Sequence, residues 1–206
     1  IADGIRVNLT QYLSSRHHQE VWVKGGEIVI DKLPYDIGFL NAIMSVSRLR
    51  VGENAEMFKT LTRANLEQLH SILVRDMSVN TGFRKNPVGV TGSKYRPLDN
   101  IFQIQEAAEA LSSPVSKMET PYAKALMALL GISYIQPFED GNKRTARLLA
   151  NALLLAHGCA PLSYRSADEN DYREGILVFY ELNSIVPFKT IFVDQYEFAA
   201  KNYAVK

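Results

Sequence analysis

The chain has 206 residues, of which 47% are hydrophobic, so it can bury one good-sized core. Its formal net charge of +1 argues against a general binder of nucleic acid or membrane surfaces. The single cysteine, Cys159, excludes an internal disulfide and is typical of a reducing compartment. No signal peptide is visible, and the longest unbroken apolar run, Ala125–Leu130, is too short to span a bilayer. Composition therefore predicts a cytoplasmic protein with no nucleic-acid or membrane partner.

The N-terminal part predicts a small hairpin followed by the main domain. In residues 20–30, two runs rich in β-branched and aromatic residues flank Gly25-Gly26, which can adopt the positive φ angles of a two-residue turn. The apolar period then changes to that of a helix over residues 35–50. We therefore expect an N-terminal extension over residues 1–34 and a helical domain over residues 35–206.

A clearer helix is predicted over residues 62–77. Thr62 is a good N-cap, and Leu61 and Leu66 are spaced as a hydrophobic staple. His70 lies beside the apolar face of this helix. Because the sequence offers it no partner, we interpret it as a core or helix-surface histidine rather than a catalytic one.

The segment 78–97 is rich in turn residues. Val88, Val90 and Tyr95 surround Thr91-Gly92-Ser93, a pattern that predicts a short exposed hairpin. A surface loop is the simpler interpretation. Its glycines allow close approach of a ligand, so the segment is also a candidate lid or peptide-docking edge.

From Pro97 onward the pattern is helical. The first predicted helix runs from about residue 98 to Ser112-Ser113-Pro114, and the second begins at Thr120-Pro121 and has an almost wholly apolar body. The third runs from Arg144 to His157 and is closed by Gly158. The fourth runs from Asp168 or Asn170 to about 182, and the last from Val186-Pro187 toward the C-terminus. The fold class is therefore mainly α, with one or two small hairpins.

The loop between the two most apolar predicted helices, together with the start of the second helix, carries an acidic pair, Glu139 and Asp140, and three cations, Lys143, Arg144 and Arg147. Free N–H groups and the positive dipole end make a helix N-terminus a natural anion site. Arg144 and Arg147 share a helix face, and Asp140, one turn earlier, suits a magnesium ion bridging phosphates. The alternative is an ordinary helix start with surface cations. Because both helices are apolar on nearly every side, an uncompensated charge at their ends would be costly, which favours an anionic ligand or a protein carboxylate.

Residues 136–147, Gln-Pro-Phe-Glu-Asp-Gly-Asn-Lys-Arg-Thr-Ala-Arg, closely resemble the Fic-domain signature His-Pro-Phe-x-(Asp/Glu)-Gly-Asn-(Gly/Lys)-Arg-x-x-Arg. Residues 87–100 also resemble the family's flap hairpin, and residues 61–74 the helix before it. The resemblance covers roughly residues 35–200. It implies a Fic-type helical domain, with a short β-hairpin flap, that transfers AMP from ATP to a hydroxyl of a target protein.

The site residues follow from this resemblance position by position. Asp140 would bind Mg²⁺. The nucleotide would be held by Gly141, Asn142, Lys143, Arg144 and Arg147, with Arg147 steadying the leaving pyrophosphate or the γ-phosphate. The flap residues Val88, Gly89, Val90, Thr91 and Gly92 would dock the target by strand addition.

Two positions depart from the commoner family pattern. Gln136 replaces the histidine that acts as general base, and an amide cannot take a proton near neutral pH. Lys143 stands where glycine is commoner in the family. The Doc branch also has lysine at this position, and that branch resembles a kinase. Three hypotheses stay open: AMP transfer that is slow or uses another base; a nucleotide-binding regulatory module without transfer; and a phosphotransferase or the transfer of another nucleotide moiety. The family's inhibitory helix motif has no clean match, so inhibition by a partner protein also stays open.

Overall fold

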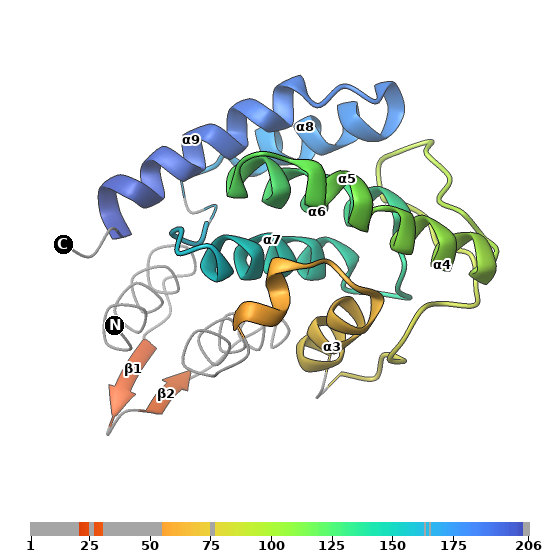
Figure 1. Cartoon of the computed structure of the whole chain (residues 1–206), viewed down its shortest axis with the longest axis horizontal. Helices are drawn as coiled ribbons and strands as arrows, with labels where there is room; N and C mark the ends of the chain where they lie inside the picture. Colours follow the sequence, from red (N-terminus) through yellow and green to blue (C-terminus); the bar gives the residue numbers. More distant parts are fainter. Residues whose placement is uncertain are drawn as a thin grey trace.

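A computed structural model describes residues 21–24, 27–30, 55–74, 77–162, 164 and 166–203. Almost all of these residues are helical or lie in loops between helices (Figure 1). The elements are β1 (Val21–Lys24), β2 (Glu27–Ile30), η1 (Ala55–Lys59), α3 (Arg63–Leu73), α4 (Ile101–Ala110), α5 (Ser112–Lys117), α6 (Pro121–Ile135), α7 (Asn142–Ala156), α8 (Glu169–Leu182) and α9 (Val186–Tyr203).

The N-terminal hairpin is confirmed. Strands β1 and β2 pair antiparallel, with Val21 opposite Ile30 and Lys24 opposite Glu27. The helix predicted over residues 35–50 lies outside the described residues.

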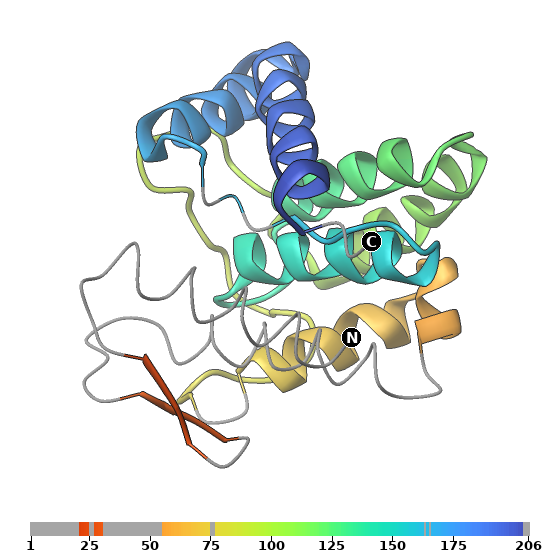
Figure 2. The same ribbon diagram turned by 90° about the vertical axis from the view of Figure 1, so that its left-hand side faces the viewer.

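Helices α6 and α7 form the centre of the molecule and lie side by side (Figures 1 and 2). Helix α3 and η1 pack against α7, while α8 packs against α6 and also against α9. Leu129 and Ile132 of α6, and Leu149 and Leu153 of α7, are completely buried. The almost wholly apolar sequence of α6, and the leucines that cover most of the circumference of α7, predicted this central position, because a helix that is apolar on nearly all sides is stable only when it is surrounded. Among the described residues, no helix is long and apolar enough to cross a membrane.

The predicted helix ends are confirmed at several caps. The Thr62 side chain accepts a hydrogen bond from Asn65 N (3.2 Å), and the Thr120 side chain accepts one from Ala123 N (3.2 Å). Asp168 caps α8 in the same way. Gly158 follows α7 with a φ of 71°, the left-handed conformation that ends many helices.

Several helix boundaries differ from the prediction, and α7 for example begins at Asn142 rather than Arg144. Helix α3 ends at Leu73 rather than near residue 77. The helix expected to end near Ser112-Ser113-Pro114 stops at Ala110, and the chain continues directly as α5. Pro114 does not interrupt α5 because it lies in the first turn, where its missing N–H would have no partner within the helix.

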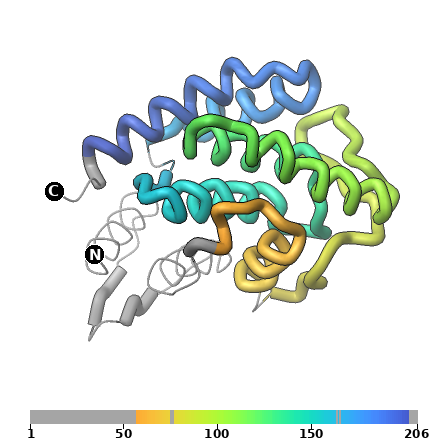
Figure 3. The backbone as a smooth tube through the Cα atoms, viewed as in Figure 1, coloured from red at the N-terminus to blue at the C-terminus, as the bar shows by residue number. Residues whose placement is uncertain are grey.

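The predicted flap hairpin at residues 88–95 is wrong. The connection from α3 to α4 contains neither helix nor strand over its described residues and runs past one end of the helices (Figure 3). Its tip is a single turn, in which Ser93 N donates to Val90 O (3.1 Å). The next two N–H groups bond side chains: Lys94 N donates to Glu181 Oε1 (3.0 Å) and Tyr95 N to Ser93 Oγ (3.0 Å). Donors engaged in this way cannot form a strand ladder.

Candidate functional site

The loop from α6 to α7 reverses the chain within a few residues. Gln136 ends α6 in the left-handed conformation, with φ 51° and ψ 58°, and its N–H donates to Ile132 O (3.0 Å). Gly141 precedes α7 with φ 77°. A Cβ added at Gly141 would lie 3.2 Å from Leu73 Cδ2, so both the φ angle and the close approach of α3 favour glycine. This reversal places the N-terminus of α7 beside the C-terminus of α6.

Asn142 closes the loop with both ends of its side-chain amide. Its Oδ1 accepts from Phe138 N and its Nδ2 donates to Phe138 O, both at 2.8 Å. Asn142 is buried, and Phe138 is completely buried beneath the loop. The side chain of Asn142 therefore shapes the loop and leaves ligand contact at this position to its backbone.

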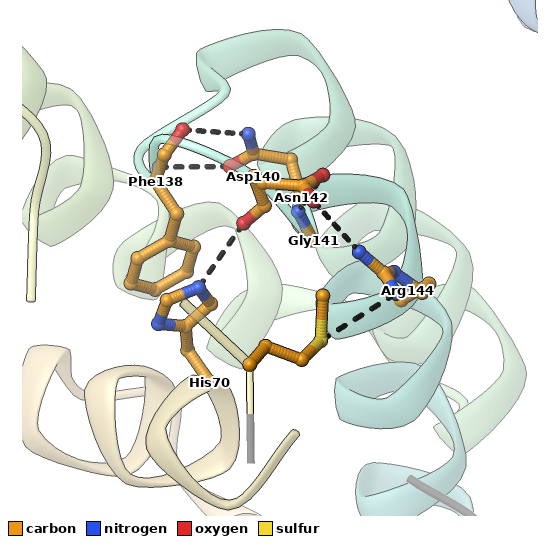
Figure 4. Close-up of polar contacts among 7 residues, drawn as sticks. His70, Phe138, Asp140, Gly141, Asn142 and Arg144 are labelled. Carbon is orange, nitrogen blue, oxygen red and sulfur yellow. Dashed lines mark hydrogen bonds and ion pairs between the residues drawn. The ribbon is translucent and has the colours of Figure 1, made fainter. Parts of the chain in front are cut away.

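His70 of α3 supports the loop from below, as Figure 4 shows. Its ring stacks on that of Phe138 at a centroid distance of 3.7 Å and an interplanar angle of 1°. Its Nε2 lies 3.1 Å from Asp140 O. Burial of the ring lowers the pKa of His70 below its usual value, which favours the neutral form. The interpretation as a core histidine is confirmed, and its contacts tie it to the loop of the candidate site.

The donors of an anion site already converge on one carboxylate. Asp140 accepts from Gly141 N at Oδ1 (2.5 Å) and from Arg144 Nη2 at Oδ2 (3.1 Å) (Figure 4). The Asp140 carboxylate, which is about 60% exposed, stands in for an oxyanion at these two donors. A phosphate could take its place, because an arginine fork and a helix N-terminus both suit phosphate oxygens.

Two further cations, Lys143 and Arg147, lie in the first turns of the same helix, α7. Lys143 is half-buried, and burial, with a smaller contribution from nearby Arg147, lowers the pKa of its ammonium group. The Arg147 guanidinium lies over the ring of Tyr172, 5.7 Å from the ring centroid. Tyr172 belongs to α8, so a second helix helps to orient this arginine.

These groups surround an open pocket of about 360 Å³. It brings together every predicted site residue except Gly92. Its lining consists of Val88, Gly89, Val90, Thr91, Gln136, Glu139, Asp140, Gly141, Asn142, Lys143, Arg144 and Arg147. Gly92 instead turns toward α8, where an added Cβ would lie 3.9 Å from Leu177 Cδ1.

Gln136 lines this pocket, and its side-chain nitrogen has two neighbours. Its Nε2 donates to Ser133 O (2.5 Å) and lies 3.5 Å from the Tyr180 hydroxyl oxygen. A backbone carbonyl only accepts, so the contact with Ser133 fixes the orientation of the amide. The remaining polar atom, Oε1, can accept a hydrogen bond from a ligand hydroxyl but cannot remove its proton near neutral pH. Burial raises the pKa of the neighbouring Tyr180, so its hydroxyl is no substitute base.

Arg84 joins three segments around the pocket and was missed by the sequence analysis. It is only 1% exposed. Its guanidinium donates to Gln136 O (2.6 Å), to Asn86 O (2.9 Å) and to Leu98 O, while its own N–H donates to Pro137 O (2.9 Å). Nothing in the sequence of this loop, which is rich in turn residues, distinguishes a buried arginine from an exposed one. Only the tertiary structure could reveal the burial of Arg84.

Glu181 of α8 was also missed. Its Oε1 accepts from both Ser93 Oγ (2.9 Å) and Lys94 N (3.0 Å). These hydrogen bonds lower the pKa of its carboxyl group. They link the tip of the 88–95 loop to α8, and a glutamate on a solvent-facing helix gives no sequence sign of such a role.

The fold and the site together define a helical protein with an open pocket, lined by three cations, at the N-terminus of α7. Residues 60–154 match the family model described as Fic/DOC family. Protein adenylyltransferase Fic of Drosophila mojavensis is 30% identical over 146 residues, which are 68% of this chain and 29% of that protein. The chain thus carries a Fic/DOC family domain.

Solved structures show the same fold. A Fic family protein from Desulfovibrio desulfuricans superposes with a TM-score of 0.70 at 17% identity, covering 97% of this chain and 64% of that one. The BepC protein of Bartonella tribocorum, solved with bound AMPPNP, gives a TM-score of 0.59 at 15% identity over 77% of this chain and 83% of that one. The chain spans less than a third of the length of the curated relatives it matches.

Proposed function

We propose that the protein binds ATP in this pocket and transfers AMP to a hydroxyl group of a target protein. The hydroxyl oxygen would attack the α-phosphorus while the bond from that phosphorus to the α,β-bridging oxygen breaks; a phosphodiester would form, pyrophosphate would leave, and the hydroxyl proton would pass to water. The observation that carries the proposal is the convergence of Gly141 N and Arg144 on one carboxylate, since donors that meet one oxygen-bearing anion are suited to another. Relatives named protein adenylyltransferase and the AMPPNP bound to the Bartonella protein support the choice of nucleotide and reaction.

The chain's own residues divide the work. The Gly141 and Asn142 N–H groups would face the α-phosphate at the start of α7. Arg144 would hold a phosphate after releasing Asp140, Lys143 would add positive charge, and Arg147 would steady the leaving pyrophosphate. Gln136 Oε1 would orient the attacking hydroxyl by accepting its hydrogen bond.

Asp140 is the residue that would hold Mg²⁺. The described residues contain no group of three or more histidine, cysteine, aspartate or glutamate side chains that could hold a metal by itself. This suits Mg²⁺, which usually takes one or two carboxylates and completes its shell with phosphate oxygens and water. When bound, the ion would neutralise charge on the phosphates.

Gln136 favours a second candidate function, a nucleotide-binding regulatory module without transfer. Its amide nitrogen is held by Ser133 O, so the side chain is well placed but offers no proton acceptor. Loss of a general base costs about 10²–10⁴-fold in rate. Nucleotide binding would remain under either candidate.

Incubation with Mg²⁺ and ATP labelled at the α- or the γ-phosphate separates the candidates. Label from the α-phosphate on the protein itself or on lysate proteins supports AMP transfer. Label from the γ-phosphate instead indicates a phosphotransferase, for which Lys143 is the motivation. No label together with ATP binding supports the regulatory module, and no binding of ATP contradicts both.

Residues 88–92 remain the proposed docking site of the target. Val88–Thr91 border the pocket, but as a loop rather than a strand.

Control by an inhibitory partner protein, a cytoplasmic location and a boundary between residues 34 and 35 also stay predictions.

A further inference from the structure

His70 contacts the anion-binding loop at two points. It is completely buried in α3 among leucines. The ring stacks face to face on Phe138, and Nε2 lies 3.1 Å from Asp140 O (Figure 4). A leucine at position 70 would continue the apolar face of α3 just as well for packing. The polar contact with Asp140 therefore requires another explanation.

The hydrogen bond defines which nitrogen carries the proton. Asp140 O can only accept, so Nε2 is the N–H donor. Nδ1 of the same ring is buried and has no hydrogen-bond partner among the described residues. The ring is thus used for one donated hydrogen bond and one stacking contact, both directed at the loop.

Holding the carbonyl of Asp140 also orients the N–H of Gly141. The peptide unit between them is planar and, as for every peptide bond in the described part of the chain, not cis. In a trans peptide the C=O and the following N–H point in opposite directions. Since the Asp140 carbonyl points toward α3, the Gly141 N–H points away from α3, where it now meets the Asp140 carboxylate.

We infer that His70 is a positioning residue for the nucleotide site, acting by holding the 140–141 peptide so that Gly141 presents its N–H to a phosphate oxygen. The inference rests on the proposed nucleotide binding. His70 itself lies beneath the loop and is not among the residues that line the pocket. Its effect reaches the ligand through the orientation of one peptide.

Two substitutions separate the hydrogen bond from the packing. His70→Gln keeps an N–H donor near the position of Nε2, while His70→Phe keeps the aromatic stack on Phe138 and removes the donor. Affinity for ATP with Mg²⁺ would be measured by calorimetry, together with the unfolding midpoint of each variant. His157→Gln, at the far end of α7, is the matched control.

We expect His70→Phe to weaken ATP binding about tenfold or more, equivalent to about 1.4 kcal/mol, and His70→Gln to restore most of it. Amide hydrogen exchange in a peptide spanning residues 138–145 should also be faster in His70→Phe than in His70→Gln. Should His70→Phe not fold, His70→Leu replaces it as the donor-free variant.

Unchanged ATP affinity in the donor-free variant would overturn the inference while leaving the proposed function intact. Equal losses in His70→Gln and the donor-free variant would also overturn it, because packing alone would then account for the effect. No ATP binding by the unsubstituted protein would remove the proposed function, and the inference with it.

Discussion

Gln136 is held firmly in place, but its amide side chain cannot act as a base near neutral pH. Left-handed backbone, burial and the bond to Ser133 O all hold it at the end of α6. Its Oε1 can orient a hydroxyl but cannot accept the proton. We therefore expect Gln136 to lower the rate of transfer and to leave the affinity for the nucleotide unchanged.

Replacing Gln136 by histidine should raise the rate of AMP transfer by about 10²–10⁴-fold, because it introduces a base that titrates near neutral pH. The measurement is the initial rate of α-label incorporation at saturating ATP. Gln136→Ala is the control and should show no gain. An unchanged rate in a histidine variant that still binds ATP would contradict the assignment of this position.

Arg84 is the second residue on which the site depends. Replacement by methionine would leave the carbonyls of Gln136, Asn86 and Leu98 without its guanidinium. Of these three hydrogen bonds only the one to Gln136 O is buried, and a buried acceptor left unsatisfied costs roughly 1–3 kcal/mol, so the free energy of unfolding should fall by about that amount. Urea denaturation measures this. Arg96→Met, at an exposed position of the same segment, should change it by no more than about 0.5 kcal/mol; equal effects would contradict the role of Arg84.

At the level of elements, α8 does not line the pocket but supports the residues around it through three side chains. Tyr172 lies under the Arg147 guanidinium, Tyr180 is close to the Gln136 amide, and Glu181 binds the tip of the 88–95 loop. Tyr172 and Tyr180 are eight residues apart and so lie close to one face of the helix. The helix thereby couples the position of the loop to that of the cation and the amide.

Glu181→Ala should release the loop tip, because both hydrogen bonds from Ser93 and Lys94 are lost. Limited trypsin digestion should then cleave after Lys94 several-fold faster than in the unsubstituted protein. Glu174→Ala, an exposed position on the same helix, is the matched control. Equal cleavage rates in the two variants would show that Glu181 does not restrain the loop.

For the whole molecule, the pocket joins the loop between α6 and α7, the start of α7 and the loop before α4, with α8 in contact behind them, so a bound nucleotide should stabilise these elements together. A ligand at 100 times its dissociation constant contributes about 2.7 kcal/mol. For a chain of this size this corresponds to a rise in melting temperature of about 5–10 °C.

Thermal unfolding with ATP and Mg²⁺ should show this rise, and chelation of the metal should reduce it. Arg147→Ala should reduce the rise caused by ATP but not the rise caused by AMP, which lacks the phosphates assigned to Arg147. Lys189→Ala, on the exposed surface of α9, should change neither. Identical ATP effects in Arg147→Ala and the unsubstituted protein would contradict the assigned site.

That the residues of the candidate anion site line one pocket could be predicted from the sequence, because they lie close together in the chain. Asp140, Gly141, Arg144 and Arg147 lie within one loop and the first turns of one helix, where spacing alone determines which side chains share a face. The central position of α6 was predictable from local sequence too, since an almost wholly apolar helix is stable only when it is buried. Thr62, Thr120 and Asp168 marked helix starts through local hydrogen bonds.

The supporting contacts could not be predicted, because they join residues far apart in the chain. His70 reaches Asp140 across 70 positions, Arg84 reaches Gln136 across 52, and Glu181 reaches Lys94 across 87. The sequence pattern at 88–95 was compatible with a hairpin, but Glu181 engages a donor that a strand ladder would need. Local sequence alone thus determined the chemistry that the loop after α6 carries. Only packing between distant elements decided how that loop is held, since burial and hydrogen bonding depend on neighbours that chain spacing does not specify.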